Sequence, residues 1–449
     1  MKTTLPGILL PAVAGLLAGL LSAVAQPGAS DPKTSYTLEQ AITTALTNNP
    51  SARVAGHRLR AARALVEQAD SALWPRLQFE TSYMGTDNPM MVFGSILNQR
   101  AFSPTLDFND VPEVDNLDVR GIVTVPLYTG GLISANRRAA RAGTEAARAD
   151  ADAVRQTLAF EVARTFHTVL KTREFIRAAE AGVTAFEANL AIANKRLAAG
   201  TLLRAEVLDV EVRLAQARED LVRARNANDL TQRVLINLLG VELPDITVVE
   251  TTETPAEPAE GAGAVRPELT AMAQRTSAAA ATVRAASSGY LPRLGLFGSA
   301  QYDYGFKTEG DGGSWSAGAL VQWDLWDGKL THGRVQEAKA NLATAEEESR
   351  RVRLGIDLEV QQARLRLNEA RERLAVSAAA VSQAEESVQL TRARFEQGLA
   401  IATQLIDAET SLTGARVRRA EAQADARIAI AALRKALGLP QLETTPAAN

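Results

Sequence analysis

Two stretches of the chain place acidic side chains at the same distance from a glycine. RLAAGTLLRAEVLDVE covers residues 196–211 and RFEQGLAIATQLIDAE covers residues 394–409. The arginine, the glycine and two acidic residues of the first stretch recur 198 positions later. Such carboxylates complement the positive end of a helix, and around a symmetric pore they make a ring of negative charge that favours cations. Their chemistry therefore depends on the elements that position them.

Side chains typical of other kinds of site are absent or isolated. The sequence contains no Walker-type loop, dinucleotide-binding glycine motif, Gly-x-Ser-x-Gly or His-Glu-x-x-His. His57, His167 and His332 stand alone on helical stretches, and there is no cysteine. We therefore predict no catalytic residue, no cofactor and no metal site, and no enzyme. The 49 basic and 52 acidic residues nearly balance, which argues against nucleic acid as a partner.

The first 25 residues have the layout of a secretory signal peptide. A lysine precedes an apolar run, and Ala23-Val24-Ala25 follows as a cleavage site. No later window offers about 18 consecutive apolar residues, as a membrane-spanning helix needs. An exported chain of this kind that enters a membrane would do so with strands.

The rest of the chain contains an internal duplication. Pro75-Arg76-Leu77 recurs as Pro292-Arg293-Leu294, an offset of 217, while the glycines are offset by 198, so the first copy has 19 extra residues. Two copies of one unit that differ in a loop explain both offsets. We predict a first repeat over residues 26–240, a linker over 241–265, a second repeat over 266–438 and a tail over 439–449.

Each repeat reads as helix, strand, loop, strand, long helix, turn and helix. Thr37 and Gln40 predict a capping box at the first helix. Alternating apolar residues predict strands at 76–85, 118–128, 293–305 and 314–326. The predicted helices after the strands are 131–198, 203–239, 329–396 and 401–437. Gly310–Gly313 are interpreted as a turn between two strands, and the 84–117 loop of the first repeat is expected at the cell surface. In each repeat, two shorter helices end to end match the length of one long helix.

Aromatic residues gather in or beside the predicted strands. Strands of about ten residues suit a tilted crossing of a bilayer, and Trp and Tyr favour its interfaces with water. A soluble four-stranded sheet with an aromatic core is the alternative. We predict contact with a membrane interface through Trp74, Tyr83, Tyr128, Tyr290, Tyr302, Tyr304, Trp315, Trp323 and Trp326.

Four strands cannot close a barrel, and an open sheet edge in lipid leaves backbone groups without partners. Two chains would give eight strands, whose interior is filled by side chains. Three chains would give 3 × 4 = 12 strands and a lumen. The predicted fold is an α+β membrane protein with long antiparallel coiled-coil helices, in which each chain contributes four strands to a 12-stranded barrel of a homotrimer.

On these residues the chain resembles the TolC-like outer-membrane efflux channels. The resemblance covers residues 37–438 and depends on the duplication, the paired strands and the two motifs Arg196, Gly200, Asp209, Glu211 and Arg394, Gly398, Asp407, Glu409. It implies a trimeric duct, with a 12-stranded barrel in contact with outer-membrane lipid and an α-helical barrel that continues through the periplasm. It also implies a periplasmic adaptor docked on the hairpin tips and an inner-membrane transporter that supplies energy.

The resemblance assigns two sets of residues to the hairpin tips. The set expected to dock the adaptor is Arg196, Gly200, Leu202, Leu203, Arg394, Gly398, Leu399 and Ile401, with the four apolar side chains exposed; local hairpin packing is the alternative. The set expected at the pore constriction is Glu206, Asp209, Gln404 and Asp407. The family's constriction uses two acids three residues apart, and here Gln404 replaces one of them. Arg196 and Arg394 are expected to pair with the acids of neighbouring hairpins.

We interpret the chain as the passive exit duct of a tripartite efflux pump for small molecules, such as drugs, toxic compounds or metal ions. The same duct serving type I protein secretion is an alternative, because the sequence does not separate the cargo. A soluble periplasmic coiled-coil scaffold is an alternative of another class. An inner-membrane adaptor would need an anchor and only one hairpin per chain.

Overall fold

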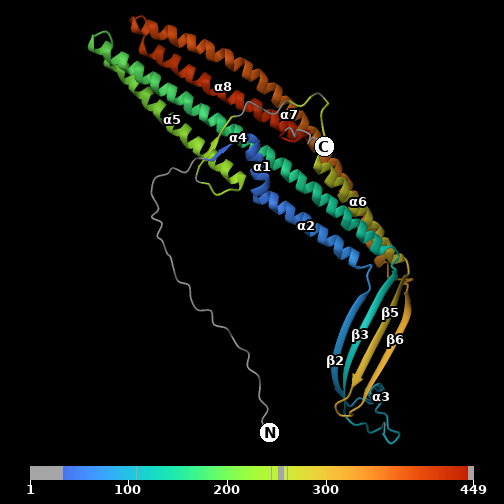
Figure 1. Cartoon of the computed structure of the whole chain (residues 1–449). Coiled ribbons are helices and arrows are strands. Elements are labelled where there is room, and N and C mark those ends of the chain that lie inside the picture. Colours follow the sequence, from blue (N-terminus) through green and yellow to red (C-terminus); the bar gives the residue numbers. More distant parts are fainter. Residues whose placement is uncertain (1–33, 108, 244, 251–256, 260, 443–449) are drawn as a thin grey trace, which may run out of the picture.

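The computed structural model describes residues 34–442 except 108, 244, 251–256 and 260. The predicted signal peptide and residues 443–449 of the predicted tail lie outside this part. The described chain is elongated, with long helices at one end and a four-stranded sheet at the other (Figure 1). Among the described residues, no helix combines the length and the apolar character that a membrane-spanning helix requires.

Long helices make up most of the molecule. α4 (Leu132–Ala198) and α7 (Leu330–Glu396) each contain 67 residues, about 100 Å at 1.5 Å per residue. The shorter helices are α1 (Leu38–Asn48), α2 (Pro50–Ser71), α5 (Arg204–Leu239), α6 (Pro267–Ser287) and α8 (Ala402–Ala436). A 3₁₀ turn, Ser288–Tyr290, follows α6.

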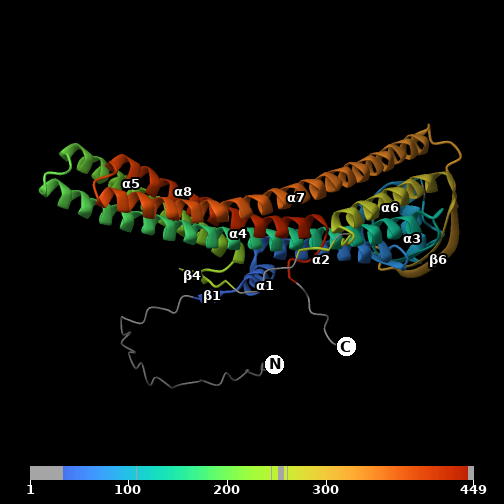
Figure 2. The same cartoon turned by 90° about the horizontal axis from the view of Figure 1, so that it is seen from above.

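The helices lie side by side in a fixed order. α2 and α5 both pack along α4, and α6 and α8 both pack along α7. α6 and α8 also pack on the other side of α4, so α4 lies between two layers whereas α7 is at an edge (Figures 1 and 2). This is the predicted arrangement of two short helices beside one long helix.

The starts of the first two helices follow from their capping residues. The backbone N–H of Thr37 donates to Gln40 Oε1 at 3.0 Å, and the N–H of Gln40 donates to the Thr37 hydroxyl at 3.3 Å. This confirms the predicted capping box. Asn49 accepts from the N–H of Ser51 at 2.8 Å and precedes Pro50, which suits a first helical position because no N–H is needed there.

The sheet contains β2 (Arg76–Thr86), β3 (Val114–Tyr128), β5 (Arg293–Tyr304) and β6 (Asp311–Gln322), all antiparallel and in that order. Its register aligns Leu77, Val123 and Gly298 across one face, so the apolar rows share that face. Residues such as Glu80, Arg120 and Gln301 align on the other face. β2 and β6 have no second partner within the described chain, so both edges of the sheet are open.

Two strands differ in extent from the prediction. β3 begins at Val114 instead of residue 118, and β6 covers 311–322 instead of 314–326. The difference in β6 arises because Tyr304 pairs with Asp311. Asp311–Gly313 therefore belong to the strand and not to the turn, and Trp323, Leu325 and Trp326 follow the strand. Trp323 Nε1 donates to the carbonyl of Tyr290 at 3.1 Å.

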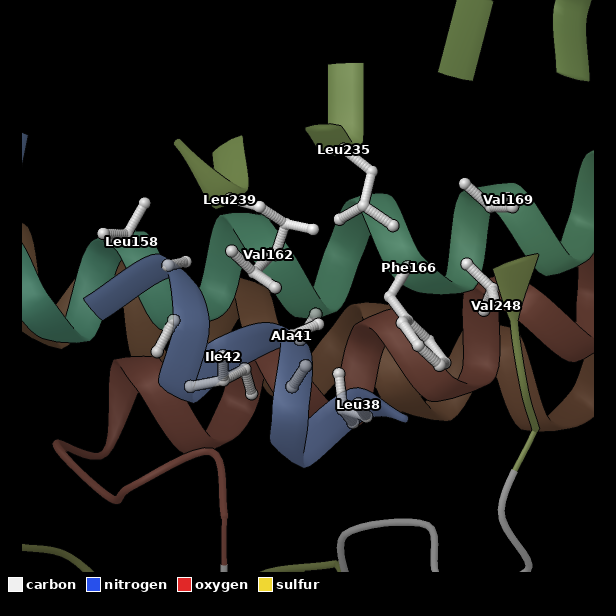
Figure 3. Packing of buried hydrophobic residues seen from close by; sticks show 14 of the residues in the cluster. Leu38, Ala41, Ile42, Leu158, Val162, Phe166, Val169, Leu235, Leu239 and Val248 are labelled. Atoms are coloured by element: carbon white, nitrogen blue, oxygen red, sulfur yellow. The ribbon is translucent and has the colours of Figure 1, made fainter. Parts of the chain in front are cut away.

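The predicted linker contains a short strand that was not predicted from the sequence. β4 (Ile246–Val248) pairs in parallel with β1 (Thr34–Tyr36), with Thr34 opposite Ile246. Beside this pair, α1, α4 and α5 bury one apolar cluster near the middle of the helical region (Figure 3). Its labelled members are Leu38, Ala41, Ile42, Leu158, Val162, Phe166, Val169, Leu235, Leu239 and Val248. We call the pair and this cluster the waist.

The 84–117 loop also has structure of its own. It contains α3 (Pro89–Asn98), which packs Val92 and Ile96 against Val114 at the end of the sheet remote from the long helices (Figure 1). Gln99 is buried, and its amide donates to the carbonyl of Asp115 at 2.6 Å and to Asn116 Oδ1 at 2.8 Å. The loop is therefore tied to β3.

A buried histidine lies at the waist. His167 on α4 is 4% exposed, and its ring meets that of Phe166 edge to face at 5.8 Å between centroids. Burial, assisted by the nearby Arg427 and opposed by Glu250, lowers the pKa of His167 to about 4. Arg427 and Glu250 form an ion pair at 2.5 Å. His167 is therefore neutral in the folded chain at pH 7.

Candidate functional site: the two hairpin tips

Both hairpins reverse direction in the same way. After α4, Gly200 has φ +70°, and the N–H of Thr201 donates to the carbonyl of Arg196 at 2.9 Å. After α7, Gly398 has φ +79°, and the N–H of Leu399 donates to the carbonyl of Arg394 at 2.8 Å. Glycine reaches this left-handed conformation without a steric penalty. The repeated glycines therefore make two equivalent turns at the end of the molecule remote from the sheet (Figure 1).

The two tips pack against each other as one unit. Side chains from α4, α5, α7 and α8 bury a common apolar cluster just behind the turns. The cluster contains Phe186, Ala193, Leu202, Val207, Val210, Leu214, Phe395, Ala402, Leu405 and Ile406. Because both repeats contribute, the position of one tip fixes that of the other.

The apolar residues of the turns divide into buried and exposed. Leu202 is 7% exposed and belongs to the shared cluster, whereas its neighbour Leu203 is 71% exposed. Leu399 and Ile401 are also exposed. The expectation that Leu202 is exposed is therefore wrong. It failed because adjacent residues of a turn point in different directions, and only the packing of the second hairpin decides which one is covered.

Arg196 joins the tips through carbonyl groups. Its guanidinium lies 4.8 Å from the centroid of the Phe395 ring, and Nη1 donates to the carbonyl of Phe395 at 2.9 Å. Nη2 donates to the carbonyl of Thr201 at 3.1 Å. The expected ion pair with an acid of the neighbouring hairpin is therefore wrong for Arg196. The carbonyl of Phe395 at the end of α7 and the carbonyl of Thr201 in the first tip bind it instead. Arg394 is exposed.

The four residues expected at the constriction fall into two groups. Glu206 Oε2 accepts from the N–H of Leu203, and Gln404 Oε1 accepts from the N–H of Ile401, each at 3.3 Å. Both side chains thus cap the helix that follows the turn. Asp209 and Asp407 lie one turn further along α5 and α8 and are exposed. Of the four, these two carboxylates are free to act on solvent or ions.

Glu409 belongs to the repeated motif, but its role was not predicted from the sequence. Glu409 is buried and accepts from Asn189 Nδ2 at 3.2 Å and from Arg392. Asn189 is on α4, so this carboxylate links the two hairpins. A buried acid on an apolar helix face is the signal that could have found it.

A groove of about 520 Å³ lies between α4, α5 and α8 just behind the tips. Phe175, Gly182 and Phe186 of α4 line one wall, and Gly414 of α8 lines another. The small residues Gly182 and Gly414 leave the space open. Among the described residues, no group of three or more potential metal ligands lies close together.

The aromatic residues fall into two bands at opposite ends of the sheet. Strand register places Tyr83 opposite Leu117 and Tyr304, far from the long helices, with Tyr302 and Trp315 nearby. The other band lies beside the strand ends that meet the helices, and it contains Trp74, Tyr128, Tyr290, Trp323 and Trp326. Most of these rings are exposed in the single chain.

Comparison with known proteins identifies the class to which this arrangement belongs. The family described as "Outer membrane efflux protein" matches residues 41–241 and 260–439, and the chain belongs to that family. It is therefore an outer-membrane channel protein that reaches into the periplasm, and not an enzyme or a soluble scaffold.

Particular relatives cover most of the chain. It is 26% identical to the Pyoverdine export outer membrane protein OpmQ of Pseudomonas putida over 89% of this chain and 85% of the relative. It is 24% identical to the Outer membrane protein TolC of Vibrio cholerae over 64% and 68% of the two chains. The solved structure of the Campylobacter jejuni CmeC outer membrane channel aligns with a TM-score of 0.80 and 16% identity, over 91% of this chain and 87% of that one. This structural likeness shows a shared fold.

Proposed function

We propose that three copies of this chain form the outer-membrane exit duct of a tripartite efflux pump. The observation that carries this proposal is the open sheet, whose edge strands β2 and β6 both lack a second partner within the described chain. In lipid, unpaired backbone groups cost several kcal/mol each, so the edges must pair with other copies. Three copies supply 3 × 4 = 12 strands, enough for a lumen.

The faces of the sheet support this membrane role. The apolar rows and the two aromatic bands would contact outer-membrane lipid, with one band at each interface. The opposite face, which includes Glu80, Arg120 and Gln301, would line the lumen. The long helices continue from the sheet and would form an α-barrel in the periplasm.

The tips are the proposed docking site of a periplasmic adaptor, which connects the duct to an inner-membrane transporter. Leu203, Leu399 and Ile401 place exposed apolar surface at the turns, beside Gly200 and Gly398. Such surface suits a protein partner better than water alone. Arg196 and Arg394 would support the docking surface from behind, and Leu202 would do so as part of the buried cluster.

The proposed constriction contains Asp209 and Asp407, with Glu206 and Gln404 as helix caps beside them. Threefold symmetry would place three copies of each exposed carboxylate around the opening. Such a ring attracts cations.

The proposed cargo is a small compound, such as a drug, a toxic compound or a metal ion. The similarity to a protein named for pyoverdine export over most of the chain supports this choice. Type I protein secretion through the same duct is the alternative.

Conductance of the purified protein in planar bilayers tests the duct. We expect a trimer by native mass and cation-selective channels, with Asp407→Ala reducing the selectivity and the exposed Asp229→Ala on α5 leaving it unchanged. Unchanged selectivity of Asp407→Ala would remove this residue from the pore. A monomer without conductance would refute the duct.

Export in the host tests the docking surface. Loss of the chain should increase sensitivity to toxic compounds, and the triple variant Leu203→Ser, Leu399→Ser, Ile401→Ser should fail to restore resistance although the same amount of trimer reaches the outer membrane. The exposed Val265→Ser, remote from the tips, should restore it. Full resistance with the triple variant would place the adaptor elsewhere.

A further inference from the structure

The two tips repeat in sequence, but their surroundings differ. A Cβ atom at Gly398 would lie 3.5 Å from Nη2 of Arg196, which covers this turn. Its repeat mate Gly200 has no such neighbour within 4 Å, and Arg394, the repeat mate of Arg196, is exposed. Arg196 thus covers the turn at Gly398. Its repeat mate Arg394 is exposed, and no arginine covers the turn at Gly200 in the described chain.

The same difference continues along the helices. Ile406 of α8 faces the other hairpin and is 4% exposed, whereas its repeat mate Leu208 of α5 is 45% exposed. On the opposite edge, Val376 of α7 is exposed, whereas its repeat mate Ala178 of α4 is buried. Since 330 − 132 = 198 and 396 − 198 = 198, α4 and α7 have the same helical phase throughout.

The exposed faces of α7 and α5 therefore correspond, through the repeat, to two surfaces that pack against each other within the chain. Within the chain, α4 and its tip pack against α8 and the tip of the second hairpin. The repeat mates of these two surfaces are the outer face of α7 and the outer face of α5. They lie at opposite edges of the row of helices, as Figure 1 shows, so they cannot meet within one chain. A second copy of this chain carries the complement of each.

We propose that Arg394 clamps the first tip of a neighbouring copy, lying against Gly200 and donating to the carbonyl of Leu197. This inference rests on the proposed trimer. Leu197 is the repeat mate of Phe395, whose carbonyl accepts from Arg196. The clamp needs a carbonyl at the helix end and a glycine that lets the guanidinium approach, and the first tip has both.

The clamp between copies is weaker than the clamp within a chain. Phe395 offers its ring to Arg196, whereas Leu197 offers an aliphatic side chain, so the cation–π contact has no counterpart. Glu409 is bound by Arg392 and Asn189, but the repeat mates of these two residues are Asn194 and Ser387, which are uncharged. Three strong and three weak joints would alternate around the opening. Dilation of the tips therefore begins between copies.

Cysteine pairs test the proposed contact, because the chain has no cysteine of its own. A Cβ atom at Gly182 would lie 3.2 Å from Thr413 Oγ1, and the repeat mates of these residues are Ala380 and Ala215. The double variant Ala380→Cys, Ala215→Cys should give covalently linked dimers and trimers on a non-reducing gel, and reductant should separate them. The control Gly182→Cys, Thr413→Cys should form its disulfide within one chain.

Native mass of the same samples separates the possible failures. A trimer that forms the control disulfide but no disulfide between copies in the Ala380→Cys, Ala215→Cys variant would overturn the inference and leave the duct standing. A protein that remains monomeric would overturn the duct itself. Because Ala215 and Ala380 are not buried, neither substitution removes core packing.

Conductance of the trimer tests the arginine. Loss of one charge-assisted hydrogen bond per copy should raise the open probability of Arg394→Ala roughly tenfold. Arg394→Lys should restore closure in part, because lysine keeps the charge but has no guanidinium fork. The control Arg177→Ala removes an exposed arginine whose partner is Glu174 on the same helix, and it should behave as the parent does. An open probability of Arg394→Ala equal to that of Arg177→Ala would overturn the clamp.

Discussion

Helices α4 and α7 are repeat mates of equal length, yet α4 is enclosed and α7 is exposed. α4 lies between α2 and α5 on one side and α6 and α8 on the other, whereas α7 packs mainly along α6 and α8 and lies at an edge of the row. His167 of α4 is 4% exposed, and its repeat mate Leu365 of α7 is 69% exposed. This reverses the usual preference for burial, because the apolar leucine is exposed and the titratable histidine is buried. Exposure at these two positions therefore follows the place of each helix in the row more than its local sequence.

The largest expected effect concerns the enclosed histidine. Because the folded chain keeps His167 neutral, the unfolded chain binds its proton more readily, with a pKa of 6.5 against about 4. The contribution of His167 to the free energy of unfolding is therefore fully present above pH 6.5 and is lost as the pH falls to 4. The loss is about 3 kcal/mol per chain. His167→Leu, which copies the residue of α7, should remove this part of the pH dependence of unfolding.

Thermal and denaturant unfolding, followed by circular dichroism between pH 4 and pH 7, measures the effect. His57 is exposed on α2, so His57→Leu is the matched control and should keep the pH dependence of the parent. If the His167→Leu and His57→Leu proteins lose stability equally on acidification, the enclosure of α4 does not govern the titration of His167.

A smaller effect should distinguish the two repeated glutamates. Glu409→Gln should lower the free energy of unfolding by about 2 kcal/mol, because the buried carboxylate binds Arg392 and Asn189. Glu211→Gln should cost less than about 1 kcal/mol, because its contact with Arg204 is long, at 3.4 Å, and both groups are partly exposed. Denaturant titration of the two variants measures the difference. Equal losses would show that the tips are energetically equivalent despite their different surroundings.

The smallest effect should be the same in both tips. Glu206→Ala and Gln404→Ala each remove one capping hydrogen bond of 3.3 Å. Each variant should lower the free energy of unfolding by about 0.5–1 kcal/mol. Hydrogen exchange of the N–H groups of Leu203 and Ile401 should accelerate by roughly twofold to fivefold in the respective variants. Unequal acceleration would show that the surroundings of the tips affect even their local caps.

The sequence predicted the elements whose signals are local. The periodicity of the strands and the helices, the glycines of the tips and the capping box at Thr37 all depend on residues a few positions apart. The repeat then assigned the same element order to both halves. These signals are sufficient for the helix-and-strand architecture and for the position of the tips.

The features that the sequence did not predict depend on distant partners. β4 has three residues, and only its pairing with β1, about 200 positions earlier, makes it a strand. The end of β6 follows from its register with β5, and the burial of Leu202 follows from the packing of the second hairpin. The Arg196 clamp uses backbone carbonyls, which no sequence motif displays.

The short parallel pair at the waist has a mechanical consequence. It joins the start of the described chain to the connection between the repeats, beside the cluster around Phe166, and would act as a pivot for the part of α4 beyond it. From Val169 to Ala198 the helix α4 continues for 29 residues, a lever arm of about 44 Å. A rotation of roughly 5° at this pivot displaces the end of this arm by about 4 Å, on the order of a hydrated ion's radius. In the proposed duct, a small rotation at the waist would therefore change the width of the opening at the tips.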